Sequence, residues 1–202
     1  MQTRNPTAPA LARFALVAAA ALAATALWAQ SRPEQGLLLD AQGWQEEQMA
    51  TTPRPWPVDG WYRLLKQDDG VDVLAVKPTQ RQAVPADALY FRLPGTRLQT
   101  GFHASQRELE QWGEARPGRF SLRVEEVDAG VQYAIGYGGQ TYTYVLGPHG
   151  AQTSVDAVAD LDGDGQPDFL VDVVDQGTYL LLSSRAQPGF NRPAAELPAH
   201  GA

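Results

Sequence analysis

The chain has 202 residues, of which 44% are hydrophobic and 19% are charged, a composition that supports a folded core of one domain or two small ones. A net charge of -7 with only 16 basic residues argues against a nucleic-acid partner, because such binding depends on neutralising phosphates. The absence of cysteine excludes disulfides, thiol catalysis and thiolate metal sites.

Residues 1–29 have the pattern of a signal peptide. Positive charge at the start precedes an uncharged apolar run from Phe14 to Ala29, and small-residue cleavage sites follow Ala26 and Ala29. The run has 16 residues, fewer than the roughly 20 that a membrane-spanning helix needs. We therefore expect a periplasmic or secreted protein with no membrane span after signal cleavage.

The two ends of the mature chain show weaker patterns. Residues 30–59 contain several prolines and predict a partly extended lead-in segment, from which residues 37–39 and Trp44 could dock onto the core. Residues 187–202, which contain proline and alanine, predict a loosely ordered tail.

Residues 60–186 have the pattern of a β-rich domain. Strand-like runs cover 61–65, 71–76 and 88–93, and Asp-Gly and proline-containing turns separate them. The many glycines and prolines favour strands and turns over long helices.

One short helix is predicted after the third of these strands. Ser105 followed by Glu108 is a capping-box pattern, and Leu109 with Trp112 forms a short apolar stripe. The helix should end near Pro117, because proline cannot continue a helix.

A β-hairpin is predicted where runs at 131–137 and 140–146 flank Gly138 and Gly139. Two glycines permit the positive φ angles of a tight hairpin turn. The alternation of the strands places tyrosines on one face, either as a core face or as a platform for stacking sugar rings. These tyrosines are Tyr133, Tyr137, Tyr142 and Tyr144.

The strongest chemical signal is an acidic loop that begins at Asp160. Seven aspartates and no lysine or arginine lie between Asp156 and Asp175. Two carboxylates about 4 Å apart repel by roughly 4 kcal/mol at an effective dielectric near 20, so a folded loop of this kind needs a cation or protons. At neutral pH a cation is the simpler solution.

The spacing of the loop favours Ca²⁺. Carboxylates at loop positions 1, 3, 5 and 9 and a backbone carbonyl at position 7 can converge on one ion, and all of them are hard oxygen donors. The predicted ligands are Asp160, Asp162, Asp164, the carbonyl of Gln166, and Asp168. Mg²⁺ ranks second, because it prefers to keep its waters.

An EF-hand is the competing interpretation of the loop. It requires a bidentate glutamate at position 12, where this chain has Val171, and an exiting helix, where residues 169–174 have the composition of a buried strand. A second apolar run at 179–182 follows the turn at 175–177, so the loop should lead into another hairpin.

With these residues in place, the segment from about 153 to 184 resembles a single FG-GAP/VCBS-type repeat. The resemblance depends on the motif Ala159-Asp-Leu-Asp-Gly-Asp-Gly-Gln-Pro-Asp-Phe-Leu-Val171 and on the apolar run downstream. It implies calcium binding by Asp160, Asp162, Asp164 and Asp168. It does not extend to the β-propeller that such repeats usually build, because one copy cannot supply the blades.

The predicted fold class is mainly β: a single sandwich- or barrel-like domain with one short helix and a C-terminal calcium-loop hairpin at 153–184. The predicted function is that of an exported, non-catalytic protein that Ca²⁺ stabilises and that binds an envelope protein, an extracellular partner or a glycan. The alternative is a periplasmic or secreted hydrolase with a divalent-metal-dependent site. Against it, the sequence has neither a G-x-S-x-G nor an H-E-x-x-H motif.

Overall fold

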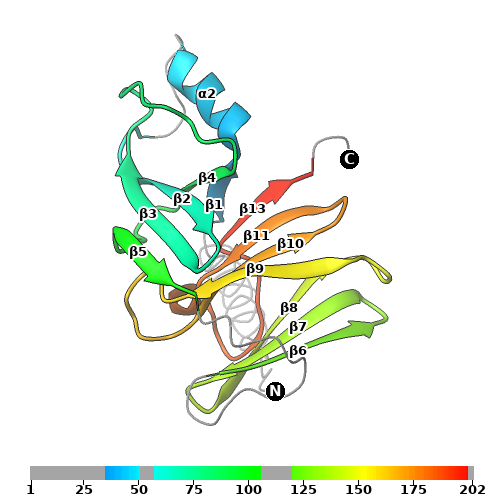
Figure 1. Cartoon of the computed structure of the whole chain (residues 1–202). Helices are drawn as coiled ribbons and strands as arrows, with labels where there is room; N and C mark the ends of the chain where they lie inside the picture. The colour runs from blue at the N-terminus through cyan, green and yellow to red at the C-terminus, as the bar shows by residue number, and fades with distance from the viewer. Residues whose placement is uncertain (1–34, 51–56, 106–119, 200–202) are drawn as a thin grey trace, which may run out of the picture. The chain divides into compact units, whose positions relative to one another are not determined.

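A curved sheet that forms a nearly closed barrel makes up most of the structure (Figure 1). The computed structural model describes residues 35–50, 57–105 and 120–199, which belong to one compact unit that begins at Gln35. Nine strands of these residues form the barrel. In sheet order they are β5 (Gly101–Ala104), β3 (Gly70–Val76), β2 (Trp61–Gln67), β4 (Ala88–Arg92), β1 (Gly36–Leu39), β13 (Ala195–Pro198), β11 (Gly177–Leu181), β10 (Asp168–Val173) and β9 (Thr153–Ala159).

Contacts of β9 and the loop after it with the other half of the sheet bring the barrel close to closure. Lys66 Nζ on β2 lies 3.0 Å from Asp156 Oδ2 on β9. The backbone N–H of Gln99 donates a hydrogen bond of 2.8 Å to the carbonyl of Leu161, in the loop that follows β9. The barrel interior holds a first hydrophobic core, to which nearly every strand contributes. Its members include Leu38, Leu64, Val73, Phe91, Leu161, Leu170, Leu180 and Leu182.

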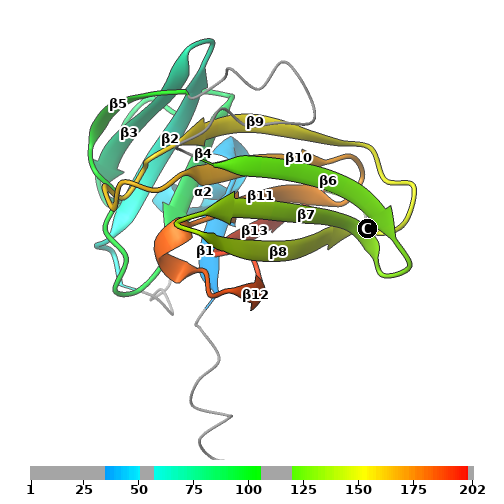
Figure 2. The same cartoon turned by 90° about the horizontal axis from the view of Figure 1, so that it is seen from below.

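A second sheet packs against one part of the barrel (Figure 2). Its strands are β12 (Gly189–Phe190), β8 (Gln140–Gly147), β7 (Gly130–Tyr137) and β6 (Ser121–Val127). The predicted hairpin is confirmed: β7 pairs with β8, and Gly138 and Gly139 have φ angles of +56° and +74° in the turn. Positive φ is easy for glycine and strained for other residues, which explains the glycine pair.

The strands β9, β10 and β11 contribute to two cores at once. Along β10, Phe169 and Val171 lie in a core shared with the second sheet, whereas Leu170 lies in the barrel core. Successive side chains of a strand point to opposite faces, so a strand buried on both sides must be apolar throughout. This explains the continuous apolar run that follows the acidic loop.

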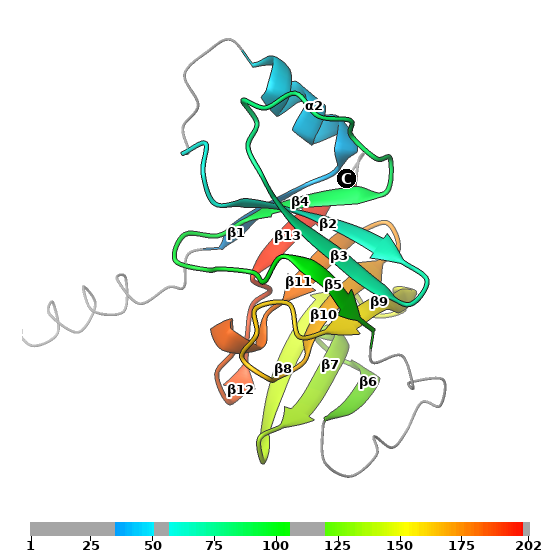
Figure 3. The same cartoon turned by 60° about the vertical axis from the view of Figure 1, so that its left-hand side comes forward.

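The helix α2 (Ala41–Met49) covers the outer face of the barrel over β4, away from the second sheet (Figure 3). Asp40 caps it, accepting a hydrogen bond of 2.7 Å from the N–H of Gly43. Trp44, only 2% exposed, stacks on Tyr90 with ring centroids 4.4 Å apart. Nowhere in the described part of the chain does a helix have the length and apolar character needed to cross a bilayer.

The expected docking of the lead-in onto the core is confirmed, because Leu38 and Trp44 are buried. Its composition did not reveal the strand β1, which pairs with β4 and β13, or the helix α2. The segment expected to be a loose tail contains β12 and β13, and β13 lies inside the sheet between β1 and β11. Buried alanines at 194 and 195 and the free edge of β11 supply the packing and pairing that the composition does not reveal.

The predicted fold class is confirmed: the described residues are mainly β, with a barrel, a second sheet and one short α-helix. The capping-box helix after Ser105 falls on 106–119, and the signal peptide falls on 1–29. Both lie outside the described residues.

Candidate metal centre

The acidic loop joins β9 to β10 and covers one end of the barrel. Its Gly163 and Gly165 have φ angles of +80° and +81°, in the left-handed region that favours glycine. Leu161 points into the barrel core from the same loop. The loop leads directly into β10, as the sequence predicts, and so does not have the exiting helix of an EF-hand.

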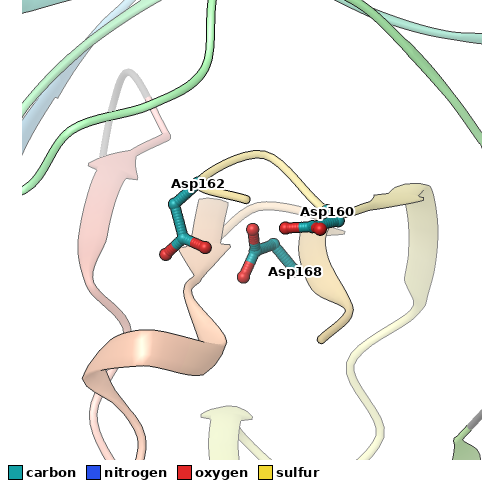
Figure 4. Close-up of side chains that lie close together, drawn as sticks. All are labelled: Asp160, Asp162 and Asp168. Atoms are coloured by element: carbon teal, nitrogen blue, oxygen red, sulfur yellow. The ribbon is translucent and has the colours of Figure 1, made fainter. Parts of the chain in front are cut away.

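Three of the predicted aspartates come together (Figure 4). One carboxylate oxygen from each of Asp160, Asp162 and Asp168 lies within 4.8 Å of the other two. Two oxygens on opposite sides of a Ca²⁺ ion, each about 2.4 Å from it, would be about 4.8 Å apart. The spacing of the three carboxylates is therefore suitable for a single divalent ion.

Asp168 is the buried member of this group, with 1% of its surface exposed. Its Oδ2 accepts a hydrogen bond of 2.8 Å from the N–H of Leu161, and its Oδ1 accepts bonds of 2.8 Å from both the N–H and the hydroxyl of Ser183. Burial, and then the negative charge of Asp162, raise the pKa of Asp168 to about 7, although these hydrogen bonds oppose the shift.

Asp160 and Asp162 are more exposed and organise the loop backbone. Asp160 accepts hydrogen bonds from the N–H groups of Gly163 and Gly165, at 2.7 and 3.0 Å. The hydroxyl of Ser184 donates to Asp162 Oδ2. Burial is the main cause that raises the pKa of Asp162, and the nearby carboxylates raise it further, while the Ser184 hydroxyl lowers it.

Asp164 lies beside the three-carboxylate group without belonging to it. Its Oδ1 accepts a hydrogen bond of 2.7 Å from the N–H of Gln166, and its Oδ2 accepts one of 2.9 Å from the hydroxyl of Ser183. Each carboxylate oxygen has two acceptor positions, so these bonds leave capacity for an ion. Coordination by Asp164 and by the carbonyl of Gln166 stays a prediction.

Two serines contact the acidic group and were not among the predicted site residues. Ser183 and Ser184 follow β11, at the edge where β10 begins. The register explains this placement. Phe169 pairs with Leu181 in an antiparallel ladder, so Asp168, just before Phe169, comes close to the residues that follow Leu181. The sequence contained a signal for this contact. If residues are paired outward from the predicted turn at 175–177, the position opposite Asp168 is reached just before Ser183 and Ser184.

The tyrosines of the hairpin form a core face and not a platform for stacking sugars. Tyr133 is fully buried, and Tyr137 and Tyr144 lie with it in the core between the two sheets. Tyr137 stacks on Tyr142 with centroids 4.0 Å apart. Trp61 is also buried, under α2.

A depression of about 390 Å³ lies at the open edge between the two sheets. Its lining includes Gln176, Tyr179 and Glu196. Glu196 is the single carboxylate among the described lining residues, so the depression holds no carboxylate pair of the kind that acid–base catalysis uses. Glu125 and Glu126, an acidic pair in sequence, lie on opposite faces of β6: the first contacts Gln132 and the second His149.

Comparison of the chain with protein-family models, with curated proteins and with solved structures finds no match. The resemblance of residues 153–184 to an FG-GAP/VCBS-type repeat therefore stays a prediction from the motif alone. The role of the acidic loop has to be inferred from its own geometry and charge.

Proposed function

We propose that this chain is an exported, non-catalytic protein whose β-rich domain is stabilised by Ca²⁺ bound at the acidic loop, and which binds an envelope or extracellular partner. The observation that carries the proposal is the approach of the Asp160, Asp162 and Asp168 carboxylates to within 4.8 Å of one another. Export is supported by the signal-peptide pattern at 1–29.

The electrostatics of the group support a bound cation. At separations of 4 to 5 Å, each pair of ionised carboxylates repels by roughly 3 to 4 kcal/mol at an effective dielectric near 20. Hydrogen bonds from the loop offset part of this cost. The pKa values of Asp162 and Asp168 are nevertheless raised, mainly by burial and further by neighbouring carboxylates, so that ionising both groups still costs free energy. A divalent cation would remove the remaining cost without protonation.

The donor set supports Ca²⁺ over other ions. The three clustered carboxylates and the two further predicted ligands, the carboxylate of Asp164 and the backbone carbonyl of Gln166, offer oxygen atoms alone. Zinc and copper prefer nitrogen and sulfur, whereas Ca²⁺ takes six to eight oxygens in a flexible arrangement.

The position of the loop supports a role of the ion in stability. Asp168 accepts a hydrogen bond from the N–H of Leu161, and the side chain of Leu161 packs in the barrel core. Ser183 ties the end of β11 to the same carboxylate. An ion at this point would link three segments of chain: the loop, β10 and the segment after β11.

The burial of Asp168 also supports a structural role over the hydrolase alternative. A catalytic acid or base has to reach its substrate, and Asp168 is only 1% exposed. A calcium site outside the cell needs only modest affinity, because calcium is abundant there. Extracellular sites have dissociation constants of about 0.1 to 1 mM.

The test is calorimetric titration of the purified protein with CaCl₂, in parallel with Asp162→Asn and with Asp172→Asn as a matched control. Asp172 is a neighbouring aspartate on β10 whose Oδ1 accepts a hydrogen bond from Thr178. We expect one site in the wild type and in the control, and at least a tenfold weaker site in Asp162→Asn, because a charged ligand is lost. Equal affinities in all three proteins would refute the proposed site.

A further inference from the structure

The strand β6 lies at one edge of the second sheet (Figure 2). Within the described part of the chain, β7 is its one strand neighbour, and the two pair at every residue from Ser121 to Val127 without a register shift. Among the described residues, no strand pairs with the opposite edge of β6, whose seven residues contain neither glycine nor proline. Such an edge is a template for another strand.

The two faces of β6 have different chemistry. Leu122 and Val124 are partly buried and pack against the core between the sheets. Arg123 and Glu125 point to the opposite, outer face, where their side chains are 73% and 37% exposed and lie 3.5 Å apart. The edge therefore has an outer side with one charge of each sign and an inner side on which Leu122 and Val124 are followed by Glu126, whose exposed carboxylate lies 3.0 Å from His149 Nε2.

The order of these charges selects one way of pairing β6 with a second copy of itself. In an antiparallel pair centred on Val124, residue numbers of opposite partners add to 248, so Arg123 of each copy faces Glu125 of the other. Centring the pair on Arg123 or on Glu125 would instead place like charges opposite each other. If one copy were shifted by a single residue, the apolar face of that copy would lie on the same side of the joined sheet as the charged face of the other copy.

We propose that two copies of this chain form a symmetric dimer by antiparallel pairing of their β6 strands, centred on Val124. The pairing joins the two four-stranded sheets into one sheet of eight strands. It places two Arg123–Glu125 ion pairs across the interface, and Val124 beside its own copy on the core side. A two-fold interface of this kind uses the same residues on both copies, as in most homodimers.

Charged residues on an edge strand often prevent pairing. On β6 the two outward charges have opposite signs and occupy alternate positions, so they attract in the register centred on Val124 and repel in its neighbours. Charge complementarity between directly opposite residues contributes to strand pairing and to the choice of register. The same two residues thus select a single register instead of blocking the edge.

The experiment is sedimentation equilibrium of the purified wild-type protein and of Arg123→Glu, Glu125→Arg and the double exchange. We expect a reversible dimer in the wild type. Each single variant should raise the dimer dissociation constant about tenfold or more, because two attractive pairs become repulsive. The double exchange should restore the dimer, because it recreates both opposite-charge pairs in the same register.

Lys77→Glu is the control, because it reverses an exposed charge paired with Asp59 on another part of the surface. It should leave the dimer unchanged, and thermal unfolding should show that every variant is folded. A wild type that stays monomeric at the highest soluble concentration would overturn the proposal. A dimer that the single variants do not weaken, or that the double exchange does not restore, would overturn it equally.

Discussion

Asp168 has the most demanding environment of any acidic residue in the described part of the chain. It begins β10, is 1% exposed, and accepts hydrogen bonds from Leu161 and Ser183. These bonds hold the carboxylate in place whether or not a cation is bound. Asp162 is more exposed, and its carboxylate oxygens are bonded within the loop and to Ser184. The two residues should therefore respond differently to the same change.

Asp168→Asn should lower the free energy of unfolding even in EDTA, by about 1 to 3 kcal/mol. The asparagine NH₂ group would face a backbone N–H that now bonds to a carboxylate oxygen, and two donors cannot form a hydrogen bond with each other. Asp162→Asn should have little effect in EDTA and should lose the stabilisation that added CaCl₂ gives the wild type. Urea unfolding of both variants with and without CaCl₂ measures this. If Asp168→Asn matched the wild type in EDTA, the structural part of its role would be refuted.

The pKa of Asp168 predicts a pH dependence of stability in EDTA. The folded-state pKa of about 7 is above the value of about 3.9 expected in the unfolded chain. The folded state therefore binds this proton more tightly, so the contribution of Asp168 is full below pH 4 and is lost as the pH rises through 7. The difference in unfolding free energy between the wild type and Asp168→Asn should change by a few kcal/mol over this range.

Calcium should act in the opposite direction, because the ion binds the ionised carboxylate. The apparent calcium affinity should increase as the pH is raised from about 6 to 8, as the proton on Asp168 is lost. Calorimetry at several pH values checks this. An affinity that does not vary over this range would contradict the assignment of Asp168 as a ligand.

Among the elements, β13 and β11 show how closely the C-terminal segment is built into the sheet. Gly177, the first residue of β11, has a φ angle of +145°, and a Cβ atom placed there would lie 2.2 Å from the carbonyl oxygen of Leu197 on β13. The pairing of the two strands therefore requires glycine at this position. Gly189 on β12 also has a positive φ, +95°, but open space lies around it.

Gly177→Ala should lower the unfolding free energy by about 2 to 4 kcal/mol, since backbone strain adds to a clash with the neighbouring strand. Gly189→Ala, the matched control, carries only the backbone strain and should cost about 1 kcal/mol. Thermal unfolding of the two variants compares them. Equal losses would mean that β13 does not pack against β11 as the structure places it.

At the scale of the whole molecule, three hydrophobic cores depend on one another. The strands β9, β10 and β11 separate the barrel core from the core under the second sheet, and α2 closes a third core on the outside of β4. Loss of β10 would expose both of the first two cores. We therefore expect the described unit to unfold in one cooperative transition, and the acidic loop to affect stability far beyond its own residues.

Hydrogen exchange followed by mass spectrometry tests this coupling. If the cores unfold together, adding CaCl₂ should slow exchange in β10 and β11 and also in β2 and β7, which do not contact the loop carboxylates through any of the described hydrogen bonds. Protection limited to the loop and its two flanking strands would show that the ion stabilises a local hairpin alone. Asp162→Asn serves as the control, since its exchange should not respond to CaCl₂.

The sequence by itself determined the local features whose cause is local. Gly138 and Gly139 can adopt the positive φ angles that a tight turn between two strand-like runs requires, and the predicted hairpin is present at that point. The alternating aspartates and glycines of the acidic loop are a short-range pattern, and Asp160, Asp162 and Asp168 come together within it. The apolar run after Asp168 predicted a strand, and β10 is present there.

Only the tertiary structure decided the features that depend on distant partners. Leu38 and Ala195 belong to segments with weak local signals, yet both are buried in the barrel because strands 150 residues and more apart in sequence pair side by side, with Gly36 opposite Ala195. Ser183 reaches Asp168 through the register of a hairpin. Burial and strand pairing are sums over the whole chain, and for this reason no single window of the sequence contained them.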